Sequence, residues 1–156
     1  MTGSKTDSMM NPAASSTIGS MMKELISVLH DGGHTLVVRN NTVRTFSERG
    51  VSDLYRLLRE EPEFLDGASI ADKVVGKAAA ALMVLGGVKE LHTGVISEHA
   101  LELFRRHDIR VSYDCVVPYI INRTRTGWCP METRCKDCYS AEECLTEIED
   151  FMNSKR

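Results

Sequence analysis

The chain has 156 residues, of which 42% are hydrophobic and 26% charged, and its formal net charge is -3. This length fits one globular domain, and the composition is that of an ordinary folded protein rather than a disordered or fibrous one. The slightly negative charge excludes a broad electrostatic attraction to phosphate backbones, so nucleic-acid binding is not expected.

Residues 1–19 are small and polar and include Pro12, so we expect a disordered lead. The same stretch lacks the apolar middle of a secretory signal. No run in the chain approaches the roughly 20 apolar residues that a membrane-crossing helix needs. We therefore expect a cytoplasmic protein with no membrane partner.

The next segments predict a helix and then a β-hairpin. Apolar residues recur at helical spacing in 21–31, where Ser20 is a plausible N-cap and Gly32 and Gly33 a stop. Two β-rich runs then flank Asn40 and Asn41 within 34–47, and asparagine tolerates the positive φ of a tight turn.

Two further helices are predicted before residue 88. The first lies within 50–65 and ends in a loop at Pro62. The second covers 69–87, where Ser69 is a suitable cap, the alanine run has high helix propensity, and two glycines end the pattern.

The remaining segments alternate between strand and helix. We expect strands at 89–97 and 109–117, and helices at 98–107 and 141–152. A hairpin followed by this alternation predicts an α/β fold, with a three-layer mixed sheet that carries helices on both faces and has parallel later strands. Cys115 is expected in the core. His30, His34, His92 and His107 show no metal-like pairing and are expected at the surface.

Three segments carry a resemblance to a known family: "SIADKVVGKAAA" at 69–80, "GGVKELHTGVISEHALELF" at 86–104 and "VPYIINRTRTGWCPME" at 117–132. Over roughly 36–132 the chain resembles the family called domain of unknown function 1893, whose fold is similar to that of cytidine deaminases. The resemblance implies a cytidine-deaminase-like domain at 20–128, followed by a cysteine-rich extension with a terminal helix at 129–156.

Cytidine deaminases bind zinc at the N-termini of two adjacent helices, through a His/Cys-x-Glu motif and a Pro-Cys-x-x-Cys motif. The resemblance places Asp72 and Lys73 at the first of these helix starts, and Ser97, Glu98 and His99 at the second. Neither zinc motif is present, so zinc-dependent deamination is not expected.

Two helix N-termini that face one cleft would still favour an anion. The first hypothesis is therefore a site for a small anionic molecule, for example a nucleotide-like one, and an enzyme that uses the lysines with Asp72 as acid and base stays open. The alternative is structural: a helix-start carboxylate, a close-packed Gly76, solvated lysines and Ser97 as an N-cap. The predicted ligand-binding residues are Asp72, Lys73, Gly76, Lys77, Ser97, Glu98, Asn122 and Arg123.

The segment 117–132 follows the last predicted strand and combines apolar, basic and aromatic residues. Tyr119, Arg125 and the two site residues of this segment could reach over the helix termini, with Trp128 as a cover. Alternatively, the segment closes the sheet edge, with its arginines in water and Trp128 in the core.

Four of the five cysteines form a C-x5-C-x2-C-x5-C pattern: Cys129, Cys135, Cys138 and Cys144. Four thiolates at short spacings suit tetrahedral zinc or an iron–sulfur cluster. A metal- or cluster-bearing redox sensor is therefore the second functional hypothesis, with free thiols or a redox disulfide as alternatives. The sequence also leaves a homo-oligomer open.

Overall fold

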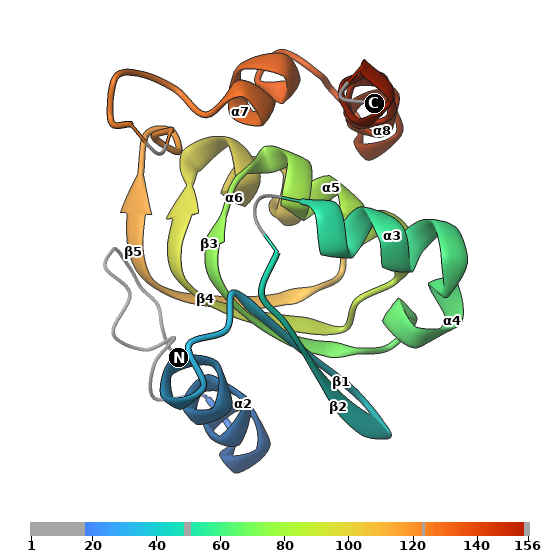
Figure 1. Cartoon of the computed structure of the whole chain (residues 1–156), viewed down its shortest axis with the longest axis vertical. Helices are drawn as coiled ribbons and strands as arrows, with labels where there is room; N and C mark the ends of the chain where they lie inside the picture. Colours follow the sequence, from blue (N-terminus) through green and yellow to red (C-terminus); the bar gives the residue numbers. More distant parts are fainter. Residues whose placement is uncertain (1–17, 49–50, 123, 155–156) are drawn as a thin grey trace.

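The computed structural model describes residues 18–48, 51–122 and 124–154, so the predicted lead lies outside them up to residue 17. The described residues form a five-stranded sheet of order β2-β1-β3-β4-β5. β1 is antiparallel to β2 and β3, while β3, β4 and β5 are parallel (Figure 1). The parallel pairing of β4 with β5 is as predicted, whereas β3 was not predicted as a strand. The strands are β1 (Leu36–Asn40), β2 (Thr42–Phe46), β3 (Ser69–Val75), β4 (Glu90–Ser97) and β5 (Arg110–Val117).

Helices cover both faces of the sheet (Figure 1). α2 lies on one face, and the helices that follow it gather around α5 on the other. The helices are α2 (Ser20–Asp31), α3 (Ser52–Glu60), α4 (Pro62–Leu65), α5 (Lys77–Gly86), α6 (Glu98–Arg105), α7 (Pro130–Cys135) and α8 (Ala141–Ser154). Among the described residues, no helix is long and apolar enough to cross a membrane.

β1 shows why helices cover both faces of the sheet, because its side chains point alternately to one face and to the other. Leu36 and Val38 are buried in the larger core around α5, whereas Val37 is buried with Leu25 and Leu29 of α2. A strand that is apolar at three consecutive positions must be covered on both sides. The predicted mixed α/β sheet with helices on both faces is therefore confirmed.

The helix predicted at 69–87 is wrong in its first half. Residues Ser69–Val75 form strand β3, and α5 begins only at Lys77, with Gly76 as its N-cap. The β-branched residues before Gly76 favour a strand that is buried between neighbours, and the alanine run alone favours a helix. Asp72 and Lys73 are consequently strand residues and do not start a helix.

Other differences are local. α2 is capped by Gly19 rather than Ser20, and the hairpin turns through Asn41 alone, at φ 69°. Short helices, each with a proline in its first turn, occur at Pro62–Leu65 and Pro130–Cys135, where none was predicted.

Two residues have the opposite burial from the one predicted. Cys115 is exposed rather than in the core, because it lies on β5 at the edge of the sheet. His92 is buried rather than at the surface, since β4 lies between β3 and β5. Its Nδ1 is 2.8 Å from the Ser112 hydroxyl, and burial lowers the pKa of His92 despite nearby Asp114.

The cysteine-rich C-terminal segment belongs to the main core. α7 and α8 both contact α5, and Cys135, Cys144 and Ile148 are buried in the cluster that also contains the alanines of α5. The segment that was predicted as an extension therefore helps to cover the helix side of the sheet.

Candidate functional site

The N-terminus of α5 is occupied by a carboxylate of the chain itself. Glu132, on α7, is 1% exposed. Its Oε1 accepts a hydrogen bond from the Lys77 backbone N–H at 3.0 Å, and its Oε2 accepts one from the Ile120 N–H at 2.9 Å. A helix N-terminus favours an anion, and here the anion is Glu132.

Gly76 permits this close approach. A Cβ at Gly76 would lie 3.1 Å from Glu132 Oε1 and 3.1 Å from a side-chain carbon of Ile120. The packing alternative for Gly76 is therefore supported, because a larger residue would press against the capping carboxylate.

The Lys77 side chain is buried at 5% exposure and is not solvated. Its Nζ donates to the backbone carbonyl of Lys136 at 3.2 Å and to that of Cys138. Lys73 is exposed on β3, so the expectation that the two lysines share one helix face is wrong.

Asp72 is half-buried in β3, beside Leu36 of β1 and Thr93 of β4. Burial raises the pKa of Asp72 to about 7, although the backbone N–H groups of Val74 and Lys73 oppose the shift. At neutral pH the carboxyl is therefore divided between its neutral and charged forms.

The start of α6, the second of the two helix starts considered in the sequence, lies where it was predicted. Ser97 is fully buried at the N-cap of α6, and its hydroxyl accepts a hydrogen bond from the Ala100 N–H at 3.1 Å. Glu98 follows in the first turn and is exposed. The capping alternative accounts for the position of Ser97.

Ser97→Ala is expected to lower the free energy of unfolding by about 1 kcal/mol, because the Ala100 N–H loses its acceptor. Urea denaturation measures the change. Ser140→Ala is the matched control, since Ser140 accepts from the Glu143 N–H at the exposed start of α8 and is expected to cost no more. A loss at Ser97 below that at Ser140 would contradict the capping role.

The segment after β5 folds over these two helix starts. Trp128 stacks on Tyr119 with ring centroids 4.4 Å apart, and its ring lies 5.6 Å from that of His99. Asn122 holds the turn together, because its side chain accepts from the Thr126 N–H and donates to the Thr126 hydroxyl. Arg123 lies outside the described residues.

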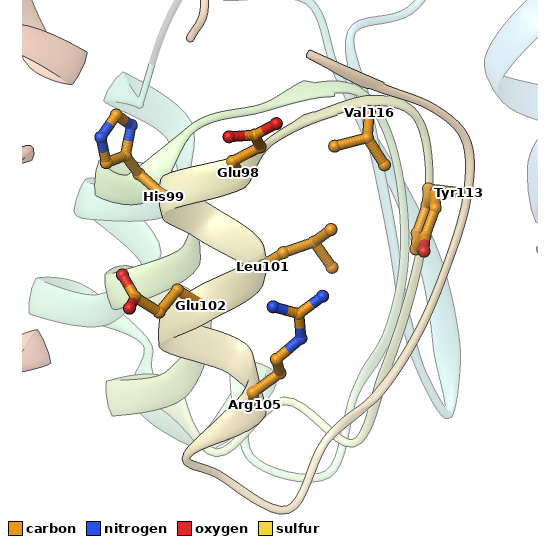
Figure 2. A pocket seen from close by; sticks show the side chains of 7 residues that line it. All are labelled: Glu98, His99, Leu101, Glu102, Arg105, Tyr113 and Val116. Carbon is orange, nitrogen blue, oxygen red and sulfur yellow. The ribbon is translucent and has the colours of Figure 1, made fainter. Parts of the chain in front are cut away.

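A groove of about 680 Å³ runs between α6 and β5 (Figure 2). Arg105 points along α6 toward Leu101, Tyr113 lies on the β5 side, and Glu98 lies at the other end. The Arg105 guanidinium makes no ion pair or hydrogen bond with the described part of the chain. The lining residues are Glu98, His99, Leu101, Glu102, Arg105, Tyr113 and Val116.

Sequence reasoning found only Glu98 of this lining as a site residue. Arg105 and Tyr113 were missed because they come from a helix and a strand that only the folded chain places side by side. The one sequence signal was the charge of Arg105 near the end of an amphipathic helix, and such a charge is ordinary for a surface position.

Three of the four predicted cysteine ligands belong to the main core: Cys135 and Cys144 are buried in it, and Cys138 packs against it. All are free thiols. The pKa of Cys144 is lowered by the hydrogen bond with Cys135 and by the Lys77 charge, against the effect of burial. Burial raises the pKa of Cys138 to about 11.

Cys129 takes no part in these interactions and packs at the start of α7. Within 18–48, 51–122 and 124–154, no group of three or more histidine, cysteine, aspartate and glutamate side chains could hold a metal ion. The zinc or iron–sulfur role of the four cysteines stays a prediction.

These features define a mixed α/β domain. The N-terminus of α5 is closed by a glutamate of the chain itself, and an open groove lies along α6. The chain belongs to the family described as "Domain of unknown function (DUF1893)", whose model matches residues 24–152. The family resemblance is thereby confirmed. Its extent is larger than expected from the sequence and includes all four clustered cysteines.

The solved structures that are similar to the chain include two from Thermotoga maritima. A DUF1893 family protein from Thermotoga maritima matches with a TM-score of 0.78 and 21% identity over 85% of this chain and 91% of that one. A diaminohydroxyphosphoribosylaminopyrimidine deaminase/5-amino-6-(5-phosphoribosylamino)uracil reductase from the same organism gives a TM-score of 0.39 and 20% identity, over 60% and 35% of the two chains. The first match supports the fold. No curated protein matches the chain.

Proposed function

We propose that this chain binds a small anionic molecule in the groove between α6 and β5. The observation that carries the proposal is the Arg105 guanidinium, which points into the groove without a partner among the described residues. A guanidinium offers paired N–H donors that match a phosphate or carboxylate. The volume of the groove suits a small organic ligand.

The other lining residues narrow the ligand class. Tyr113 presents an aromatic ring on the β5 side of the groove, and the Glu98 carboxylate at the far end can accept hydrogen bonds from hydroxyl or amino groups. A molecule with an anionic group at one end and hydrogen-bond donors at the other has matching chemistry. A nucleotide-like ligand meets this description.

The proposal moves the site away from the start of α5. Glu132 already occupies that N-terminus, and Lys77 is directed to backbone carbonyls, so Gly76 and Lys77 are left out of the proposed contacts. We also propose that the domain has a cytidine-deaminase-like frame, because helices begin side by side after the adjacent parallel strands β3 and β4. Zinc-dependent deamination is not part of the proposal.

Arg105→Ala is expected to weaken ligand binding about 10- to 100-fold, since a charge-assisted hydrogen bond contributes roughly 1.5–3 kcal/mol. The probes are adenosine and uridine 5′-monophosphates, the free nucleosides and inorganic phosphate, each followed by thermal shift and by NMR titration.

Lys23→Ala is the control, because it removes one positive charge from the exposed side of α2, on the opposite face of the sheet. It should bind every probe as the unmodified protein does. Equal affinity in Arg105→Ala, or no response to any probe, would contradict the groove proposal.

The metal hypothesis has a separate test. Elemental analysis and a visible spectrum of protein purified without oxygen would show zinc, or iron with sulfide. The Cys135→Ser/Cys138→Ser double variant should then lose that metal, whereas retention of a full equivalent would rule these two ligands out.

A further inference from the structure

β5 is an edge strand whose outer backbone groups are not paired within the described part of the chain. It pairs with β4 on one side and stands last in the sheet order (Figure 1). Such an edge is a template to which another strand can add. The Arg110 backbone N–H donates inward, to the Lys89 carbonyl at 3.1 Å. Backbone groups alternate between the two edges of a strand, so those of Val111 and Tyr113 point outward.

Three side chains of β5 lie on the sheet face that carries α2: Arg110, Ser112 and Asp114. The Ser112 hydroxyl is 2.8 Å from Nδ1 of His92, and an Asp114 carboxylate oxygen is 3.7 Å from its Nε2. His92 pairs with Ala71, which is buried against α2 and so identifies the face. The side chains of Arg110 and Asp114 are 74% and 62% exposed, so both charges are accessible to a partner.

The charges of β5 are complementary to those of a second, antiparallel copy of the same strand. If the two copies are centred on Ser112, Arg110 of each lies opposite Asp114 of the other, on one face of the sheet. Opposite charges that face each other across two strands stabilise their pairing. Within one chain these two side chains have only loose ionic contacts, each at 3.7 Å, so they remain available for this contact.

The same register also pairs the backbones. Val111 of each copy lies opposite Tyr113 of the other, and because both point outward, the two residues can exchange both of their N–H···O bonds. The other edge strand, β2, does not have this property. Its one charged residue, Arg44, is central, so a two-fold axis there would place like charges opposite each other. Arg44 is also paired already with Glu61, at 2.9 Å.

We propose that the protein forms a two-fold symmetric dimer in which the β5 strands of two copies pair in antiparallel orientation, centred on Ser112. The edge of β5 is thus occupied by a second copy of this chain, and the symmetric contact closes the assembly after two copies. Tyr113 lines the α6 groove, so Val111 of the second copy lies beside that wall of the groove. The dimer needs no ligand in the groove, so the two proposals are tested separately.

Sedimentation velocity of the full chain over a dilution series tests the dimer. The unmodified protein should reach twice the 17.4 kDa mass of one chain. Arg110→Asp and Asp114→Arg each place like charges opposite one another at both contacts, so each should raise the dissociation constant at least about 10-fold. Both side chains are exposed, so the variants should keep the fold.

Two combinations of these charge reversals should restore the dimer. The double variant Arg110→Asp/Asp114→Arg again has opposite charges at both contacts and should dimerise as the unmodified protein does. An equimolar mixture of the two single variants should form the heterodimer for the same reason. A general loss of folding or of solubility would not be repaired by either combination.

A cysteine at the two-fold axis tests the register. In a Cys115→Ser background, which removes an exposed native thiol, Ser112→Cys should form a covalent dimer under mild oxidation. The Cα atoms of such a directly opposite pair lie about 4.5 Å apart, within the range of a disulfide. Lys23→Cys in the same background is the control on the exposed side of α2 and should cross-link far less.

Four results would overturn the proposal. They are a monomer at every concentration, a dimer that survives both single charge reversals unchanged, a double variant that behaves like the single ones, and cross-linking of Ser112→Cys no faster than that of Lys23→Cys.

Discussion

Glu132→Ala is expected to lower the free energy of unfolding by about 3–5 kcal/mol. The side chain is buried, and its two oxygens accept charge-assisted hydrogen bonds from the backbone N–H groups of Lys77 and Ile120. Each such bond contributes roughly 1.5–3 kcal/mol, and its removal leaves a buried donor without an acceptor. Urea denaturation with a constant m-value measures the loss.

Two further variants make the Glu132 experiment specific. Glu132→Gln should cost less, because the amide oxygen still serves one of the two donors. Glu149→Ala removes a carboxylate from a partly exposed ion pair with Arg59 and should cost about 0–1 kcal/mol. Formate added to Glu132→Ala should restore part of the stability, since it can occupy the vacated N-terminus of α5. A loss below that of Glu149→Ala would contradict the capping role.

Asp72→Asn is expected to stabilise the protein by up to about 4 kcal/mol above pH 7. The pKa of Asp72 rises from 3.8 to about 7 on folding because the carboxyl is buried. About three pKa units at 1.36 kcal/mol each give the upper limit of the effect. Asparagine keeps the shape of the carboxyl group without the charge.

The sign of the pH dependence follows from proton binding. Between about pH 4 and pH 7 the folded state holds a proton on Asp72 that the unfolded state has released, so stability falls as the pH rises through this window. In Asp72→Asn this part of the decline should disappear, and the two proteins should have similar stability near pH 4.

Denaturation curves from pH 4 to pH 8 provide the measurement for Asp72. Asp108→Asn is the control, because Asp108 is exposed and its replacement should change stability by less than about 0.5 kcal/mol. A variant at position 72 that is less stable than the unmodified protein at pH 8 would show that the charged form is favoured in the folded state.

The local pattern of the sequence was sufficient for most elements. Alternating β-branched residues around Asn41 and the amphipathic run of α8 each depend on neighbours within one element, so their periodicity was enough. The start of α5 was misplaced because 69–75 shows no alternation: three buried residues are followed by the adjacent charged residues Asp72 and Lys73. Its period is hidden, and only pairing of β3 with β1 and β4 shows it to be a strand.

The candidate site was predicted only in part. Ser97 and Glu98 were found because capping is a local rule. The partners of Lys77 were not predictable, since its backbone N–H meets a carboxylate 55 positions away and its Nζ meets carbonyls from the same distant segment. No periodic or spacing signal marks such a contact.

The sequence by itself determined the fold class, the parallel direction of the last two strands and the concentration of cysteines near the C-terminus. These properties follow from short-range patterns of apolar, β-branched and turn residues. Only the tertiary structure decided that Glu132 closes the α5 terminus and that Arg105 faces an open groove. Both depend on which distant segments pack together, and burial then determines whether a charged side chain is paired, neutralised or left available for a ligand.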